Sequence, residues 1–102
     1  MMSPYQQLLV ITMEECGELI QACSKVLRQN QFAAEYDAPF YSPHNPADNA
    51  ISKITEEAGD LQCMIELLVE YDICSWTDLE RRVDVKRTKL KRWSDLINDD
   101  SE

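Results

Sequence analysis

The chain has 102 residues and a formal net charge of −9, with 44% hydrophobic and 28% charged residues. That composition excludes a disordered chain and fits one domain with one modest core. The acidic balance disfavours nucleic acid as a partner and suits binding of metal cations. No apolar run approaches the length of a membrane span, and no secretory signal is visible, so we expect a cytoplasmic protein without a membrane partner.

The first two predicted helices carry the apolar repeat that is typical of helical cores, and no stretch alternates with period two. The first helix is predicted over about 4–29, with Ser3 as its N-cap and Pro4 at its first position. The second is predicted over about 46–72, with Pro46 in its first turn.

The third helix is predicted over about 75–97 and opens with Ser75 in a sequence that resembles a capping box. Between the first two helices, residues 30–45 contain four aromatic side chains. A connection this long is either a binding loop or a cover for the edge of the core. We therefore predict an all-α fold, a single helical domain over 1–98, and a solvated acidic tail over 99–102.

The four cysteines show no CxxC pairing, and His44 is the only histidine, so the chain offers no zinc set. Cys16 and Cys23 lie seven residues apart, on one face of a helix. That face also carries the other members of a narrow apolar row, and we expect reduced thiols in the core. The row consists of Leu9, Met13, Cys16, Ile20, Cys23 and Leu27.

Five acidic residues do not fit a simple division into core and solvent faces. On a helical wheel of the second helix, Glu57 and Asp60 fall inside the apolar arc. On the first helix, Glu15 projects among apolar residues, Glu18 lies at the border of the apolar face, and Glu14 lies just beyond it. Burial of an ionised carboxylate costs several kcal/mol unless a cation or hydrogen bonds compensate.

The spacing of these acids predicts a metal site. Glu15 and Glu18, like Glu57 and Asp60, are three residues apart, so each pair projects from one turn. Carboxylates suit Mg²⁺, with Mn²⁺ as a substitute. Two simpler explanations remain open: ExxE pairs arise by chance in helices, and Lys53, one turn before Glu57, can neutralise a single acid.

These residues resemble a known family. The run from Glu14 to Glu18, EECGE, followed by Glu57 to Asp60, EAGD, is similar to the EExxE…ExxD signature of MazG-like all-α nucleoside triphosphate pyrophosphohydrolases, particularly the short members found in bacteriophages. The match covers about residues 5–71 well and the third helix loosely. The resemblance implies an antiparallel helical bundle of the MazG type, completed by oligomerisation as a homodimer or homotetramer, and located in the host cytoplasm if phage-encoded.

The resemblance also implies the chemistry. Glu15, Glu18, Glu57 and Asp60 would bind Mg²⁺, and Glu14 or Glu15 would be the catalytic general base. The substrate would be a ribo- or deoxyribonucleoside triphosphate, hydrolysed to the monophosphate and pyrophosphate. Residues expected to bind its phosphates are Lys53, Lys86, Lys89 and Arg92.

Two alternatives stay open from sequence. The first is hydrolysis of dUTP or of phosphoribosyl-ATP on the same scaffold. The second is a non-catalytic, acidic helical protein that binds a partner. A solvated row of charges is an equally simple reading of the basic residues in the third helix.

Overall fold

The computed structural model describes residues 1–29 and 47–97 of the chain, and these ranges contain three α-helices and no strand. The prediction of an all-α chain is confirmed. The aromatic connection predicted over 30–45 and the acidic tail predicted over 99–102 lie outside the described residues. The helices are α1 (Pro4–Gln29), α3 (Ala47–Glu70) and α4 (Trp76–Trp93).

Local capping explains where two of the helices begin. At α1 the Gln6 amide donates to Ser3 Oγ at 3.2 Å, and the Ser3 amide donates to Gln6 Oε1 at 2.9 Å, which is a capping box. At α4 the Asp78 amide donates to Ser75 Oγ at 3.2 Å. The N-caps predicted at Ser3 and Ser75 are therefore confirmed.

Both later helices end before the predicted residue. Helix α3 ends at Glu70, because Asp72 adopts a left-handed backbone with φ of 61° and its amide donates to the Val69 carbonyl at 2.9 Å. Helix α4 ends at Trp93 rather than near residue 97. Ser94 is the C-cap and has an extended backbone, so the helical conformation stops there. Its amide and its hydroxyl both donate to the Leu90 carbonyl, at 2.9 Å and 2.8 Å.

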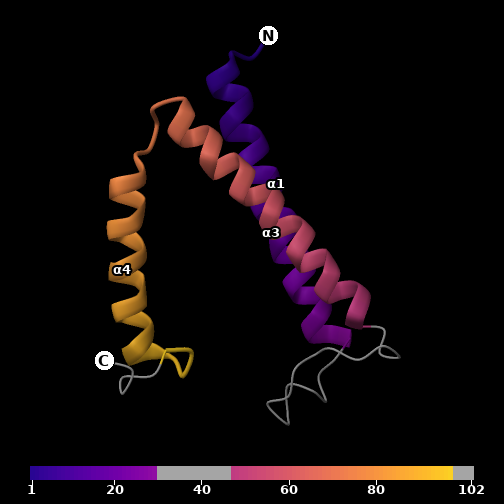
Figure 1. Cartoon of the computed structure of the whole chain (residues 1–102). Coiled ribbons are helices and arrows are strands. Elements are labelled where there is room, and N and C mark those ends of the chain that lie inside the picture. The colour runs from indigo at the N-terminus through magenta and orange to yellow at the C-terminus, as the bar shows by residue number, and fades with distance from the viewer. Residues whose placement is uncertain (30–46, 98–102) are drawn as a thin grey trace. The chain divides into compact units, whose positions relative to one another are not determined.

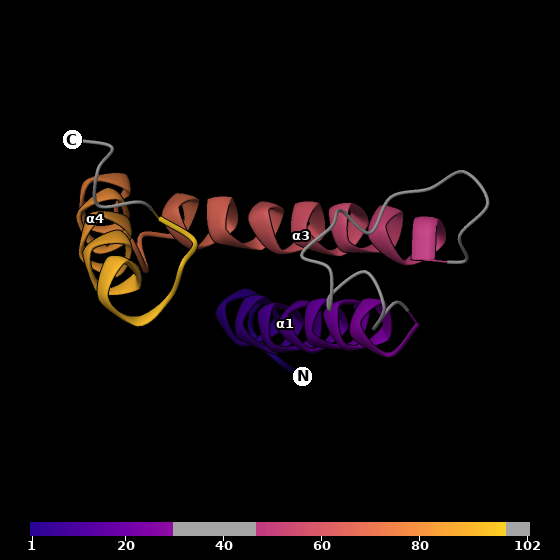
Figure 2. The same cartoon turned by 90° about the horizontal axis from the view of Figure 1, so that it is seen from below.

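Helices α1 and α3 form an antiparallel hairpin, in which they lie side by side along most of their length (Figures 1 and 2). Helix α1 and α3 as far as Leu68 belong to the first of two compact units, Met1–Leu68. The end of α3 belongs with α4 to the second, Val69–Glu102. Apolar burial among the described residues is concentrated in the hairpin. Its buried apolar side chains are Leu8, Ala22, Val26 and Met64.

The narrow apolar row of α1 does not lie in this core. Its members are exposed, including both Cys16 and Cys23, so the prediction that these thiols are buried is wrong. Cys63 is exposed as well, and Cys74 is half-buried; all four cysteines are free thiols, as predicted. The reason is that α3 packs against the neighbouring face of α1, the face that carries Leu8 and Ala22.

Helix α4 is polar and has no buried residue. Its Arg81 side chain pairs with Asp78 at 2.9 Å, and both side chains are well exposed, so the pair stabilises the helix only weakly. Over the described ranges, none of the helices combines the length and the apolar character needed to cross a bilayer.

Candidate metal and phosphate site

Three carboxylates from the two helices of the hairpin converge. Glu15 extends from α1, and Glu57 and Asp60 extend from α3; one oxygen of each lies within 4.8 Å of the others. Glu57 is only 5% exposed and is the one buried charged residue that the described part of the chain contains. Glu15 is half-buried and Asp60 is exposed. We call these three residues the acidic cluster.

The apolar pattern holds these acids in place. Leu8, Glu15 and Ala22 are seven residues apart along α1, and seven residues are two helical turns, so all three share one face. Because Leu8 and Ala22 are buried against α3, Glu15 between them must also face α3. On α3 the same spacing joins Glu57 to the buried Met64, so packing of the two helices forces Glu15 and Glu57 together.

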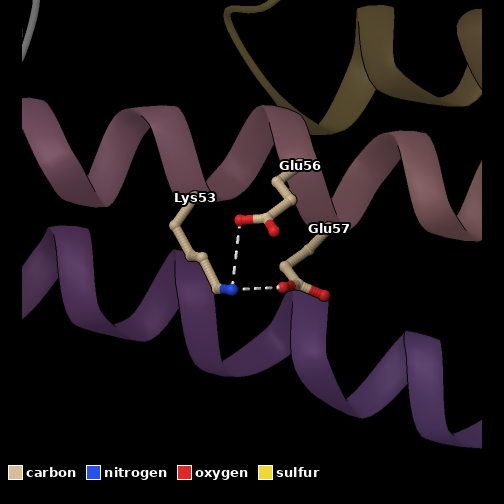
Figure 3. Close-up of polar contacts among 3 residues, drawn as sticks. All are labelled: Lys53, Glu56 and Glu57. Carbon is tan, nitrogen blue, oxygen red and sulfur yellow. Dashed lines mark hydrogen bonds and ion pairs between the residues drawn. The ribbon is translucent and has the colours of Figure 1, made fainter.

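Lys53 is the cation in contact with the cluster. Its Nζ lies 2.9 Å from Glu57 Oε1 and 3.1 Å from Glu56 Oε2, so one ammonium bridges two carboxylates (Figure 3). The Glu57 partner is one helical turn away, as the sequence predicted. The second oxygen of Glu57 is turned away from Lys53 (Figure 3). Both neighbouring carboxylates raise the pKa of Lys53, which therefore stays charged at neutral pH.

The cluster carries more negative charge than Lys53 balances. Within the described ranges, no lysine or arginine forms an ion pair with Glu15 or Asp60. Partial burial, and then the charges of Asp60, Glu57, Glu18 and Glu14 in decreasing order, raise the pKa of the Glu15 carboxyl above its ordinary value. The arrangement therefore favours any further cation that reaches the cluster.

Two of the expected acids differ from the predicted arrangement. Asp60 was placed inside the apolar arc of α3, yet it is exposed, because α1 covers only part of that arc. Glu18 was expected beside Glu15 as a ligand, but it is not among the three converging carboxylates and lies exposed on α1. Glu14 is exposed, as its position beyond the apolar border predicted.

A hollow of about 400 Å³ adjoins the cluster, and its lining includes three cationic side chains. Lys53 lines this hollow and also touches Glu57, so the two features meet at one side chain. Lys25 and Arg28 of α1 line it as well, and neither has an ion-pair partner among the described residues. Glu18 contributes its acidic wall. We call this feature the cationic hollow.

Arg28 was not singled out from the sequence, although a signal was available. Glu18 and Lys25 are two turns apart, and Arg28 is three residues further on, so all three line one side of α1. A simpler role also exists for Arg28, because a cation in the last turn of a helix interacts favourably with the helix dipole.

The three basic residues expected on one face of the third helix divide between two hollows. Lys89 and Arg92 line one of about 390 Å³ together with Trp93, which is largely exposed. Lys86 lines another, with Arg87 and several apolar side chains. These residues belong to the second unit, and their binding of substrate phosphates stays a prediction.

The donor set of the acidic cluster fits a hard divalent cation. Two ligands of one octahedral Mg²⁺ at about 2.1 Å lie about 3 Å apart when adjacent and about 4.2 Å apart when opposite. The separations within the cluster, all within 4.8 Å, are on that scale. All three donors are carboxylate oxygens, which suits Mg²⁺ and Mn²⁺ better than softer metals. Acidic groups of this kind also occur on protein surfaces without any ion.

Comparison of the chain with protein-family models, with curated proteins and with solved structures finds no match.

Proposed function

We propose that the chain is a nucleoside triphosphate pyrophosphohydrolase that uses Mg²⁺, or Mn²⁺ in its place, to hydrolyse ribo- or deoxyribonucleoside triphosphates. The observation that carries this proposal is the contiguity of two opposite features. The acidic cluster offers oxygen ligands for a metal. The cationic hollow beside it offers Lys25 and Arg28, which form no ion pair with any described residue, as cations for phosphate. A metal–triphosphate complex needs both kinds of surface side by side.

In this proposal Glu15, Glu57 and Asp60 hold the ion, with Glu18 at its margin completing the predicted ligand set. Bound there, Mg²⁺ would neutralise the negative charge of the phosphates and lower the pKa of the attacking water. Because Glu57 is buried and paired with Lys53, its carboxylate has little rotational freedom and fixes the position of the site.

Lys25, Arg28 and Lys53 would bind the phosphate oxygens in the cationic hollow. A water oxygen would then attack at the α–β phosphoanhydride, and the bond to the bridging oxygen would break to release the monophosphate and pyrophosphate. Glu15 is the better of the two candidates for the base that takes the proton from this water. It belongs to the acidic cluster, whereas Glu14 is exposed and outside the cluster.

The proposal includes a MazG-type bundle that forms a homo-oligomer in the cytoplasm. It is tested by a screen of all common NTPs and dNTPs for release of pyrophosphate with Mg²⁺ present. We expect pyrophosphate and the monophosphate in equal amounts, and no release in the presence of a chelator. Release of orthophosphate alone would contradict the proposed reaction, and hydrolysis of dUTP alone would narrow the enzyme to a dUTPase.

A further inference from the structure

Lys53 contacts the same buried carboxylate that the proposed metal ion would use. Its Nζ lies 2.9 Å from Glu57 Oε1 and 3.1 Å from Glu56 Oε2 (Figure 3). Glu57 is 5% exposed, and one of its oxygens converges with oxygens of Glu15 and Asp60. The second oxygen of Glu57 is turned away from Lys53 (Figure 3). The Glu57 carboxylate is therefore placed to contact two cations, one of which is the ammonium.

The hairpin has enough acids near this carboxylate to hold two metal ions. Many enzymes that act on phosphate groups use two ions about 3.5–4 Å apart, which is close enough for one carboxylate to bind both. Glu18 lies one helical turn from Glu15 on α1. Glu56 shares the Lys53 ammonium with Glu57. The supply of carboxylates therefore does not decide whether the site holds one ion or two.

The charge balance favours one ion as long as Lys53 is present. The three carboxylates of the acidic cluster carry three negative charges when ionised, and the Lys53 ammonium adds one positive charge. One divalent ion balances the two negative charges that remain, and a second ion would give the cluster a positive charge. Without Lys53, one divalent ion would leave a negative charge on the cluster, which would attract a second ion.

A second ion at Glu57 would also have to displace the ammonium. A divalent ion such as Mg²⁺ binds a carboxylate oxygen at about 2.1 Å, and Nζ lies 2.9 Å from Glu57 Oε1. An ion and the ammonium on that oxygen would be close neighbours of like charge, which repel each other. Lys53 is one turn away on the same helix, so it stays near Glu57, whereas an ion must arrive from solution. This attachment favours the ammonium over a second ion.

We propose that the site holds one divalent ion and that the ammonium of Lys53 acts in place of a second. An ammonium has three N–H donors, and the contacts of Lys53 with Glu57 and Glu56 use two of them. The third is left for a phosphate oxygen in the cationic hollow, which Lys53 lines. Lys53 would then connect a metal-binding carboxylate to the substrate, as the second ion of a two-metal site does.

The number of Mn²⁺ ions bound per chain tests this role, which rests on the metal site of the proposed function. Electron paramagnetic resonance of the full chain without nucleotide counts bound Mn²⁺, and two ions that share a carboxylate give a spin-coupled spectrum. We expect one tightly bound, uncoupled ion in the parent protein. A spin-coupled pair would overturn the role of Lys53 and leave the proposed function intact. Absence of any tightly bound ion would overturn both.

Substitution of Lys53 tests whether its ammonium excludes the second ion. Lys53→Met removes the charge and should bind two Mn²⁺ per chain with a spin-coupled spectrum. Lys53→Arg keeps a positive charge and should bind one ion. Lys25→Met is the matched control, because it removes a cation from the same hollow that forms no ion pair with a described residue, and it should also bind one. A coupled pair in Lys25→Met would contradict a specific role for Lys53.

Loss of the counter-ion of a buried carboxylate destabilises the fold, so Lys53→Met is examined by circular dichroism with and without Mn²⁺. We expect saturating Mn²⁺ to restore any helical signal that is lost without it, because the second ion replaces the ammonium. A folded Lys53→Met variant that binds only one, uncoupled ion would overturn the proposal. A variant that stays unfolded at saturating Mn²⁺ would overturn it as well, because the ion would then not replace the ammonium.

Discussion

The α1–α3 hairpin and helix α4 differ in how packing holds their charged side chains. The hairpin contains the buried apolar side chains, the buried Glu57 and the cations of the cationic hollow. Helix α4 is richer in basic residues but buries none of its side chains. A charge fixed by packing can select a ligand geometry, whereas a charge on an exposed helix chiefly adds to the long-range field. The comparison therefore favours the hairpin over α4 as the location of the proposed site.

The largest effect is expected at Glu57. Metal binding should stabilise the parent protein by roughly 2.7 kcal/mol at an ion concentration about 100 times the dissociation constant. This stabilisation should raise the melting temperature, and Glu57→Gln should abolish the rise. The same substitution should lower the rate of pyrophosphate release by about 100-fold or more, because loss of a metal ligand reduces activity more than loss of a group that only orients a ligand. Differential scanning fluorimetry with Mg²⁺ and Mn²⁺ provides the measurement.

Glu66→Gln is the matched control, because Glu66 is an exposed acid on the same helix and the substitution removes the same charge. It should leave the metal-dependent shift intact. An equal loss of the shift in both variants would mean that the ion binds diffusely to the acidic surface and that the acidic cluster is not a specific metal site.

A smaller effect is expected from the cations. The double substitution Lys25→Gln with Arg28→Gln should raise KM for the triphosphate about tenfold with little change in kcat. Both side chains are exposed, and two exposed ion pairs at about 0.7 kcal/mol each account for about a factor of ten. The comparison variant, Lys89→Gln with Arg92→Gln, changes the same charges on α4 and should raise KM less. If the α4 variant has the larger effect, phosphate binding belongs to α4, as the sequence alone suggested.

The smallest effect concerns pH and Glu15. Its pKa is raised in the folded protein, so ionised Glu15 destabilises the fold at neutral pH, and the destabilisation disappears as pH falls through the raised value towards 4.5. Without divalent metal, Glu15→Gln should therefore melt at a higher temperature than the parent protein at pH 7. The difference should shrink as the pH approaches 4.5. Thermal melts across this range, with Glu66→Gln for comparison, measure it.

The sequence predicted the helices well, because their signals are local. Ser3 and Ser75 are caps whose partners lie three residues away, and both bonds form. The late predicted end of the third helix has a local explanation too. Ser94 is an extended C-cap whose amide and hydroxyl both donate to the Leu90 carbonyl. The apolar repeat conceals this end of the helix, because Leu96 and Ile97 continue the pattern beyond it.

The sequence predicted burial correctly for Glu57, because its position within its own helix is enough to bury it. Glu57 lies at the centre of the apolar arc of α3, so any partner helix buries it. The exposure of Asp60 depends on which part of the arc α1 covers. The exposure of the narrow apolar row of α1 depends on which face of α1 packs against α3, and a helical wheel contains neither piece of information. The convergence of Glu15 with Glu57 and Asp60 could be expected from spacing, whereas the exclusion of Glu18 from this group required coordinates.

The Lys53–Glu57 pair bears on whether the hairpin can fold before a metal binds. A buried carboxylate that relied on a metal for its only counter-ion would leave the nascent chain unable to close its hairpin until an ion arrived. Here the ammonium of Lys53 is tethered to the same helix and is present from synthesis onward. The hairpin can therefore form without a metal, and the proposed ion could bind and dissociate afterwards without unfolding the two helices that would hold it.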